Sequence, residues 1–223
     1  MYLICMKGYY NMDLTSPRTI RNIQEQFGFT FKKGLGQNFL TARNILEEIV
    51  DAAEIESGVI EVGPGFGVLT SELAQNSDKV VTIEIDERLI DVLDYTLAEY
   101  DNVKIINEDI LKLDLTKVID DEFNGEKVSI AANLPYYITT PIITKLLEEK
   151  LPIKNIVVMV QKEVAERMSA KPSTKDYGAI TVLCQYYTEP SIVANVPASL
   201  FVPPPKVDSA VLKLKVLDKP SVE

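Results

Sequence analysis

The stretch that most constrains the fold is residues 59–70, VIEVGPGFGVLT, in which an apolar run leads into three closely spaced glycines. Residues 59–62 predict a buried strand, and residues 68–74 predict an amphipathic helix. A strand, a glycine turn and a helix in this order are typical of nucleotide-binding α/β units, because glycine lets a ligand approach the backbone and the helix N-terminus. A tight turn without a ligand would explain the loop equally well if it stood alone.

The spacing of the glycines narrows the class of ligand. In the dinucleotide fingerprint G-x-G-x-x-G the third glycine would occupy position 68, where this chain has Val68. The third glycine, Gly67, arrives one residue earlier. The spacing therefore argues against an NAD-dependent dehydrogenase, for which the chain also offers no obvious acid on the hydride side.

Composition limits the chemistry that the chain can perform. With 223 residues, of which 46% are hydrophobic, it can bury the core of one medium-sized domain. It has no histidine, and its two cysteines, Cys5 and Cys184, form no C-x-x-C motif. A metal site, a disulfide framework and histidine-based catalysis are therefore all disfavoured, and we expect a reducing cytoplasm. No segment resembles a secretory signal or could span a bilayer.

Charge is distributed unevenly along the chain. The net charge is −10, which by itself argues against a nucleic-acid partner. Basic minus acidic residues give +4 for residues 1–45, −16 for residues 46–130 and +2 for residues 131–223. A phosphate-facing surface built from the two flanks is compatible with this pattern, and ordinary solvated surface charge explains it nearly as well.

Two acidic residues follow predicted strands. The strand at residues 80–84 ends in Glu84, twenty-one residues after Gly63. A carboxylate at this position is placed to accept hydrogen bonds from both hydroxyls of a ribose. The strand at residues 103–107 is followed by Asp109, which could accept a hydrogen bond from an adenine amino group or could be an ordinary loop aspartate.

The second informative stretch follows the strand predicted at residues 128–132. Its sequence is Asn133, Leu134, Pro135 and Tyr136. Proline fixes the backbone there, so the Asn133 amide and the Leu134 carbonyl can both face the crevice at the strand ends. Two acceptors beside an aromatic face suit an exocyclic aromatic amine, whose base would stack on the ring. A turn with core tyrosines is the alternative, and it does not explain the pairing with a glycine loop.

The remaining elements are predicted from periodicity and from cap residues. A proline-rich loop at residues 197–206 would hold Phe201 either against the second face of a base or over the edge of the core. The loop at residues 32–40 could close over a ligand or could be an irregular lead into the next helix. Helices are predicted at residues 18–27, 42–53, 87–100, 140–150, 162–168 and 179–187, and strands at residues 155–161, 191–196 and 207–215, with Thr41 as a helix cap.

Five motifs in combination resemble the ribosomal RNA adenine N6-dimethyltransferase (KsgA/Erm) family: GQNFL at 36–40, EVGPG at 61–65, NLPY at 133–136, QKEV at 161–164 and FVPPPKVDSA at 201–210. The resemblance covers roughly residues 31–217. It implies the α/β, Rossmann-like, seven-stranded fold of S-adenosylmethionine-dependent methyltransferases. The expected division is an N-terminal extension with a short helix (1–30), the catalytic domain (31–217) and a tail (218–223) where the family's small helical C-terminal domain would begin.

The resemblance also implies roles for individual residues. The cofactor would be S-adenosylmethionine, with Glu84 on its ribose and Asp109 on its adenine. Asn133 would contact both cofactor and target, and Phe201 would stack on a flipped base. The full set implied for the cofactor is Asn38, Leu40, Gly63, Gly65, Glu84, Asp109 and Asn133, and the set implied for catalysis is Asn133, Leu134, Pro135, Tyr136 and Phe201. None of these residues is a general base.

Within the family, the NLPY and PPPKVDS segments resemble the small-subunit enzymes more than the resistance methylases that act on large-subunit RNA. The resemblance implies dimethylation of two adjacent adenines in the 3′-terminal hairpin loop of 16S rRNA in the 30S subunit. We expect a cytoplasmic monomer without a membrane or metal partner. Three alternatives stay open, which are an Erm-like enzyme, an amino-methyltransferase acting on DNA adenine or protein glutamine, and a non-catalytic 30S assembly factor.

Overall fold

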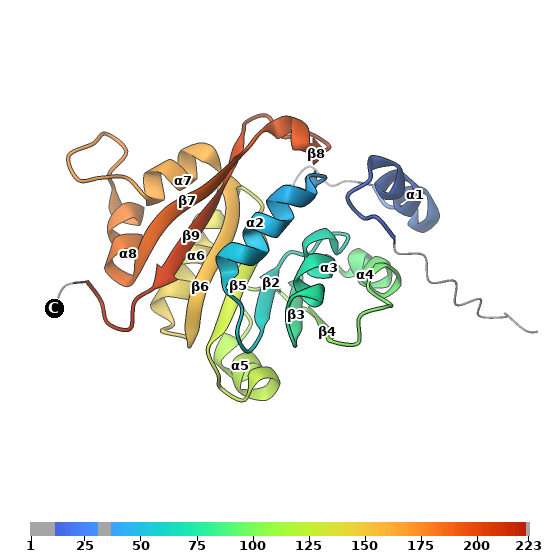
Figure 1. Cartoon of the computed structure of the whole chain (residues 1–223), viewed down its shortest axis with the longest axis horizontal. Helices are drawn as coiled ribbons and strands as arrows, with labels where there is room; N and C mark the ends of the chain where they lie inside the picture. The colour runs from blue at the N-terminus through green and yellow to red at the C-terminus, as the bar shows by residue number, and fades with distance from the viewer. Residues whose placement is uncertain (1–11, 31–36, 222–223) are drawn as a thin grey trace, which may run out of the picture.

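A seven-stranded sheet forms the centre of the computed structural model, which describes residues 12–30 and 37–221 (Figure 1). Of the loop predicted at residues 32–40, residues 32–36 lie outside the described residues, and the last two residues form strand β1 (Phe39–Leu40). The strands lie in the order β4 (Val103–Asn107), β3 (Val80–Glu84), β2 (Val59–Val62), β5 (Val128–Asn133), β6 (Ile153–Gln161), β9 (Ser209–Val216) and β7 (Thr188–Val196). The first five strands in that order run parallel, and β9 pairs antiparallel with both β6 and β7. The predicted seven-stranded α/β methyltransferase architecture is confirmed.

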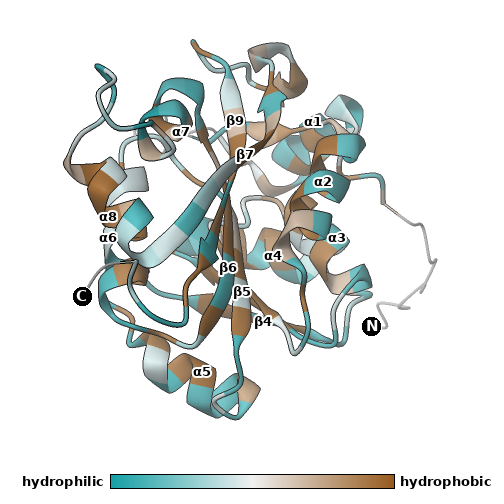
Figure 2. Ribbon diagram, turned by 60° about the vertical axis from the view of Figure 1, so that its left-hand side comes forward, coloured by the Kyte–Doolittle hydropathy of each residue, from teal (hydrophilic) through white to brown (hydrophobic). Residues whose placement is uncertain are grey.

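Helices cover both faces of the sheet, so the central strands are apolar on both sides (Figures 1 and 2). Along β6, Val157 and Met159 belong to one core cluster, and the alternating Ile156 and Val158 belong to the other. One face carries α1 (Pro17–Phe27), α2 (Arg43–Ala53), α3 (Val68–Gln75) and α4 (Ile90–Thr96), and the other carries α5 (Leu115–Phe123), α6 (Thr139–Glu148), α7 (Lys162–Met168) and α8 (Ala179–Tyr187).

A small two-stranded sheet joins distant parts of the chain. Strand β1 (Phe39–Leu40) pairs antiparallel with β8 (Phe201–Val202), which follows a 3₁₀ turn at Ala198–Leu200. The backbone N–H and the hydroxyl of Thr41 both donate to the Leu200 carbonyl, at 2.9 and 2.8 Å. The hydroxyl is therefore engaged, and Ala42 rather than Thr41 occupies the N-cap position of α2. The prediction of a Thr41 cap was wrong for this reason.

Other differences from the predicted elements have local causes. The helix predicted at residues 87–100 is a 3₁₀ turn, Glu87–Leu89, followed by α4, which ends at Thr96. The chain turns there and brings Asn102 to the end of α3, where its amide donates to the carbonyls of Ala74 and Ser77. Strand β7 starts before Pro190, which an edge strand tolerates. Helix α5, capped by the Asp114 carboxylate, was not predicted.

Candidate active site

A pocket opens at the carboxyl ends of β2, β3, β4 and β5. The chain order reverses between β2 and β5, and in open parallel sheets this switch point is where ligands bind. Eight of the predicted site residues line the pocket: Asn38, Leu40, Gly63, Gly65, Glu84, Asp109, Asn133 and Pro135. Three others, Leu134, Tyr136 and Phe201, do not line it. The pocket also contains residues that the sequence did not single out, notably Glu61, Ile85, Glu108 and Tyr137.

The glycine loop forms the floor of the pocket. Gly63, Gly65 and Gly67 all have positive φ angles, of 71°, 59° and 83°. A Cβ atom on Gly65 would lie 2.7 Å from the Cε1 atom of Phe39, so the ring of β1 packs directly on this backbone. A Cβ atom on Gly63 would meet nothing within 4 Å. Gly63 therefore leaves open space beside the pocket, as close approach of a ligand to the backbone requires.

Glu84 ends β3 inside the pocket, as predicted. Its side chain is buried and accepts a hydrogen bond of 2.7 Å from the backbone N–H of Asp86. Burial raises the pKa of this carboxyl to about 7, against the lowering effect of hydrogen bonds from Asp86 and Gly65. Two ribose hydroxyls would supply further donors to the carboxylate, so the group fits the role that the resemblance assigns to it.

Asp109 lies at the rim, past the end of β4. One carboxylate oxygen accepts from the backbone N–H of Leu111 at 3.0 Å, and the other lies 3.8 Å from the Lys112 ammonium. The side chain is half-buried and is held in place by these two contacts. Its contact with an adenine amino group remains a prediction.

Glu61 is a buried acid for which we predicted no role from the sequence. A carboxylate within an apolar strand could have indicated it. Its side chain is 1% exposed, and the Thr70 hydroxyl of α3 donates to it over 2.5 Å. Burial raises the pKa of Glu61 to about 8. The residue connects β2 to α3 beneath the glycine loop, so it supports the loop that Gly63 and Gly65 shape.

Asn133 lies at the end of β5 with its amide oriented by a distant backbone group. The side-chain Nδ2 donates to the carbonyl oxygen of Asn38 over 3.0 Å. Because nitrogen is the donor, Oδ1 is identified as the acceptor end of the amide. Among the described residues no donor reaches Oδ1, and Asn133 lines the pocket. The pocket therefore has an oriented acceptor beside the glycine loop.

The turn after Asn133 is held on both sides. The backbone N–H of Leu134 donates to the Met159 carbonyl on β6 at 3.1 Å, while the Leu134 side chain lies in the core. The half-buried Tyr136 bonds through its hydroxyl to the Ser209 hydroxyl at 2.8 Å, and burial raises its pKa. Leu134 and Tyr136 belong to the same turn as Asn133 and Pro135, which line the pocket. The contacts of Leu134 and Tyr136 with a target amine remain predictions.

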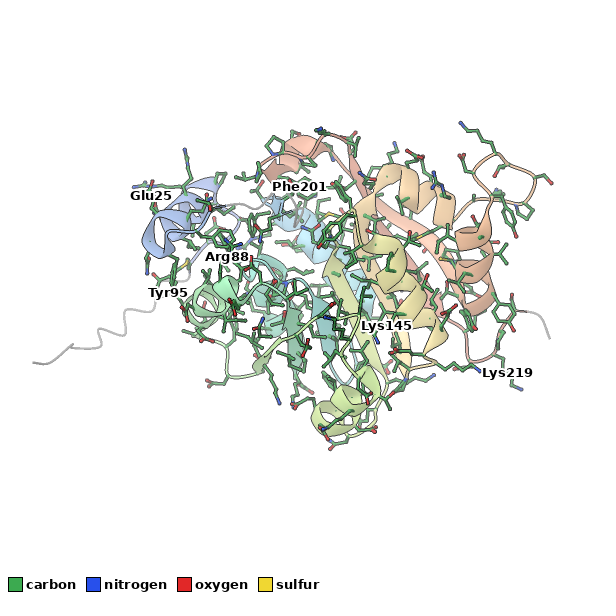
Figure 3. All side chains as sticks on the ribbon, turned by 180° about the vertical axis from the view of Figure 1, so that it is seen from behind. Glu25, Arg88, Tyr95, Lys145, Phe201 and Lys219 are labelled. Carbon is green, nitrogen blue, oxygen red and sulfur yellow. The ribbon has the colours of Figure 1, made fainter. Side chains whose placement is uncertain are left out.

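Phe201 occupies a different place from the one that its predicted role suggests. Its side chain is 3% exposed and packs in the core cluster, and the residue pairs with Leu40 in the small sheet. Phe201 is labelled in Figure 3. In this conformation the ring supports β1, which carries one wall of the pocket. Stacking of Phe201 on a flipped base stays a prediction and requires the ring to become accessible.

A charged and aromatic cluster ties α1 to the rim of the pocket. The Arg88 guanidinium binds the Asp86 carboxylate, with its Nε 2.8 Å from Oδ1, and lies 4.9 Å from the centre of the Phe29 ring. Gln37 also donates to Asp86, at 3.3 Å. Arg88 holds the pKa of Asp86 below its usual value. This cluster positions Asp86, whose backbone N–H donates a hydrogen bond to the Glu84 carboxylate.

The polar groups that line the pocket fit S-adenosylmethionine. Among residues 12–30 and 37–221, no group of three His, Cys, Asp or Glu side chains is placed to hold a metal ion. The helices within the same residues are all too short or too polar to span a bilayer. Open space beside Gly63 suits the amino acid end of the cofactor, and Glu84 and Asp109 suit its nucleoside end. The strand order and this pocket together define an S-adenosylmethionine-dependent methyltransferase.

Comparison with known proteins identifies the family. Residues 28–223 match the family described as ribosomal RNA adenine dimethylase. The ribosomal RNA small subunit methyltransferase A of Alkaliphilus oremlandii is 53% identical over 211 residues, which are 94% of this chain and 74% of that protein. The chain belongs to the ribosomal RNA adenine dimethylase family.

Two solved structures agree with this assignment. A dimethyladenosine transferase from Plasmodium falciparum is 36% identical with a TM-score of 0.71, over 81% of this chain and 64% of that chain. The 23S rRNA methyltransferase ErmE is 31% identical with a TM-score of 0.68, over 83% of this chain and 72% of that chain. The chain is therefore similar to relatives named for either ribosomal subunit: the relative at 53% identity is named for the small subunit, and ErmE is named for 23S rRNA.

Proposed function

We propose that the chain transfers methyl groups from S-adenosylmethionine to N6 of two adjacent adenines in the 3′-terminal hairpin loop of 16S rRNA. The observation that carries the proposal is the orientation of Asn133, whose Oδ1 is an available acceptor next to the glycine loop. An adenine amino group is a hydrogen-bond donor. When an acceptor holds its N–H bond, the nitrogen lone pair is less conjugated with the ring, and the nitrogen becomes more nucleophilic.

The second acceptor is the Leu134 carbonyl. Among the described residues it accepts no hydrogen bond, and Pro135 fixes the backbone that follows it. Asn133 and Leu134 would each take one N–H of the target amine, and Tyr136 would offer a ring held by Ser209. This arrangement orients the nitrogen and supports in-line transfer through positioning.

S-adenosylmethionine supplies an activated methyl group when it is bound. Gly63 and Gly65 would bring the backbone against the methionine end, Glu84 would accept from the ribose and Asp109 from the adenine. No general base is required, because the proton on the methylated amine can leave to water after transfer. Pro135, which lines the pocket, would exclude water from one side of the reacting nitrogen.

The proposed partner is the 30S subunit, and we propose that the chain acts as a monomer in the cytoplasm. The support is the 53% identity to a relative named for the small ribosomal subunit. Similarity to ErmE makes large-subunit RNA the second candidate acceptor. A non-catalytic assembly role would leave the available acceptor at Asn133 without a chemical purpose.

Tritium transfer from labelled S-adenosylmethionine distinguishes these acceptors. The chain is incubated separately with 30S particles lacking the adenine methyl groups, with 50S particles and with duplex DNA, and each product is digested to nucleosides. The proposal expects label in N6,N6-dimethyladenosine from 30S only. Label from 50S would favour the large-subunit reading, and transfer to DNA would favour a different amino-methyltransferase. Cofactor binding without transfer to any acceptor would favour the assembly role.

A further inference from the structure

Among the described residues, Tyr137 has the most exposed of the large hydrophobic side chains. It also lines the pocket. Its side chain is 59% exposed, whereas the neighbouring Tyr136 is half-buried. Among the described residues Tyr137 has no hydrogen-bonding partner and no ring partner. A large ring that borders the pocket while facing solvent can contact a ligand that extends beyond the pocket.

The turn that carries Tyr137 is well fixed. The backbone N–H of Ile138 donates to the Pro135 carbonyl at 3.2 Å, and the Thr139 hydroxyl donates to the same oxygen at 3.2 Å. Tyr136 is anchored to Ser209 on its other side. The Tyr137 ring is therefore presented on a rigid backbone, so binding against it costs little backbone ordering.

The position of Tyr137 favours RNA over the cofactor as the partner of its ring. Of the acids that suit the cofactor's nucleoside, Glu84 ends β3 and Asp109 follows β4. Tyr137 instead belongs to the turn after β5, four residues from Asn133, the acceptor proposed for the target amine. A nucleotide adjacent to the target would leave the pocket at this mouth, where an accessible aromatic face can stack on any base.

We propose that Tyr137 stacks on the nucleobase adjacent to the target adenine and so positions the RNA strand. The inference rests on the proposed function, because it takes adenine in RNA as the target. With two adjacent adenines as substrates, the stacked base would be the second adenine while the first is being methylated. The ring provides the contact, and the hydroxyl is not needed.

The test compares Tyr137→Ala with Tyr137→Phe and, as a matched control, Tyr177→Ala, which removes a tyrosine that is 36% exposed and does not line the pocket. The first readout is the KM for 30S particles lacking the methyl groups. Removing one aromatic stacking partner is expected to raise this KM by about 5- to 100-fold in Tyr137→Ala. Tyr137→Phe and Tyr177→Ala should stay near wild type, and all three variants should keep the affinity for S-adenosylhomocysteine and the melting temperature.

The second readout does not depend on turnover. An RNA hairpin carries 2-aminopurine in place of one of two adjacent loop adenines, and stacking quenches its fluorescence. Wild type and Tyr137→Phe should quench the probe, and Tyr137→Ala should not. Equal quenching by Tyr137→Ala, or a loss of S-adenosylhomocysteine affinity in that variant with an unchanged KM for 30S, would overturn the inference. Quenching by a wild-type chain that methylates no 30S would retain the inference and reject the proposed 30S reaction.

Discussion

The side-chain nitrogen of Asn133 donates to the backbone carbonyl of Asn38 over 3.0 Å, although 95 residues separate the two. This single bond orients the amide so that its oxygen is left as the acceptor in the pocket. It also joins the segment before β1 to the end of β5. The backbone at Asn38, which we propose faces the cofactor, and the amide at Asn133, which we propose faces the target, are thereby held in one geometry.

Asn133→Ala should abolish methyl transfer, because it removes the acceptor proposed for the target amine. Asn133→Asp should also be strongly impaired, since a carboxylate cannot donate to the Asn38 carbonyl and would repel it. We expect kcat to fall by about 100-fold or more in both, comparable with the loss of one preorganised polar group at a reacting centre. Single-turnover transfer to 30S particles measures this effect.

Melting temperature serves as the control for folding of the Asn133 variants. The lost hydrogen bond is worth about 1 kcal/mol in stability, so both variants should remain folded. Transfer by Asn133→Ala at a rate near that of wild type would remove Asn133 from the proposed role.

Glu84→Gln should weaken binding of S-adenosylhomocysteine by about 1–3 kcal/mol, because a charged acceptor for the ribose hydroxyls is replaced by a neutral one. The pKa of Glu84 is about 7 in the unliganded chain. Wild-type affinity should therefore rise as pH increases through 7 and the carboxyl ionises, and the variant should lose this dependence. Calorimetry between pH 6 and 8.5 measures both effects, with the exposed Glu87→Gln as control. Equal affinities for wild type and Glu84→Gln would exclude Glu84 from the site.

Glu61 should make the fold less stable at alkaline pH. Its pKa is about 8 in the folded chain against an ordinary value of 4.5, so the folded state binds more protons between these values. The contribution of the protonated group is complete below 4.5 and is lost as pH rises through 8. Glu84, with a folded pKa of about 7, acts in the same direction.

Urea unfolding across this pH range tests the contribution of Glu61. The free energy of unfolding of Glu61→Gln should decline less between pH 6 and 9 than that of wild type, because glutamine does not ionise. The exposed Glu47→Gln on α2 should follow wild type. Parallel curves for Glu61→Gln and wild type would show that the buried carboxyl does not titrate as assigned.

Alanine substitutions at Gly63 and Gly65 should differ in their effects on stability, although both should weaken cofactor binding. Gly65→Ala places a Cβ atom 2.7 Å from the Phe39 ring at a positive φ angle, so it should lose both stability and cofactor affinity. Gly63→Ala meets no protein atom within 4 Å. It should cost only about 1–2 kcal/mol from the left-handed backbone and yet reduce cofactor binding, because its methyl group occupies the open space. Urea unfolding and calorimetry measure the two effects, and equal stability losses would contradict the assignment.

Local sequence patterns predicted the main pocket residues because these residues lie at or just after the carboxyl ends of parallel strands. The glycine loop after β2, Glu84 at the end of β3 and Asn133 at the end of β5 come together once the strand order is that of a parallel sheet. Each is recognisable from its own neighbours in sequence. The strands themselves were visible as apolar runs bounded by turn residues.

Long-range pairing could not be predicted in the same way. The pairing of β1 with β8 depends on contacts such as Thr41 with Leu200, which are 159 residues apart. The burial of Phe201 follows from that pairing, so the sequence alone could not distinguish a ring that clamps a base from one that caps the core. The raised pKa of Glu61 likewise depends on helix α3 covering it, which no single strand pattern shows.

The most direct test of the proposed reaction is mapping of the methyl groups on the RNA. Wild type and Asn133→Ala are incubated with S-adenosylmethionine and 30S particles lacking the modification, and fragments of the 16S rRNA are analysed by mass spectrometry. We predict N6,N6-dimethyladenosine at two adjacent adenines of the 3′-terminal hairpin loop with wild type and none with the variant. Methylation at other positions, or the same pattern from Asn133→Ala, would contradict it.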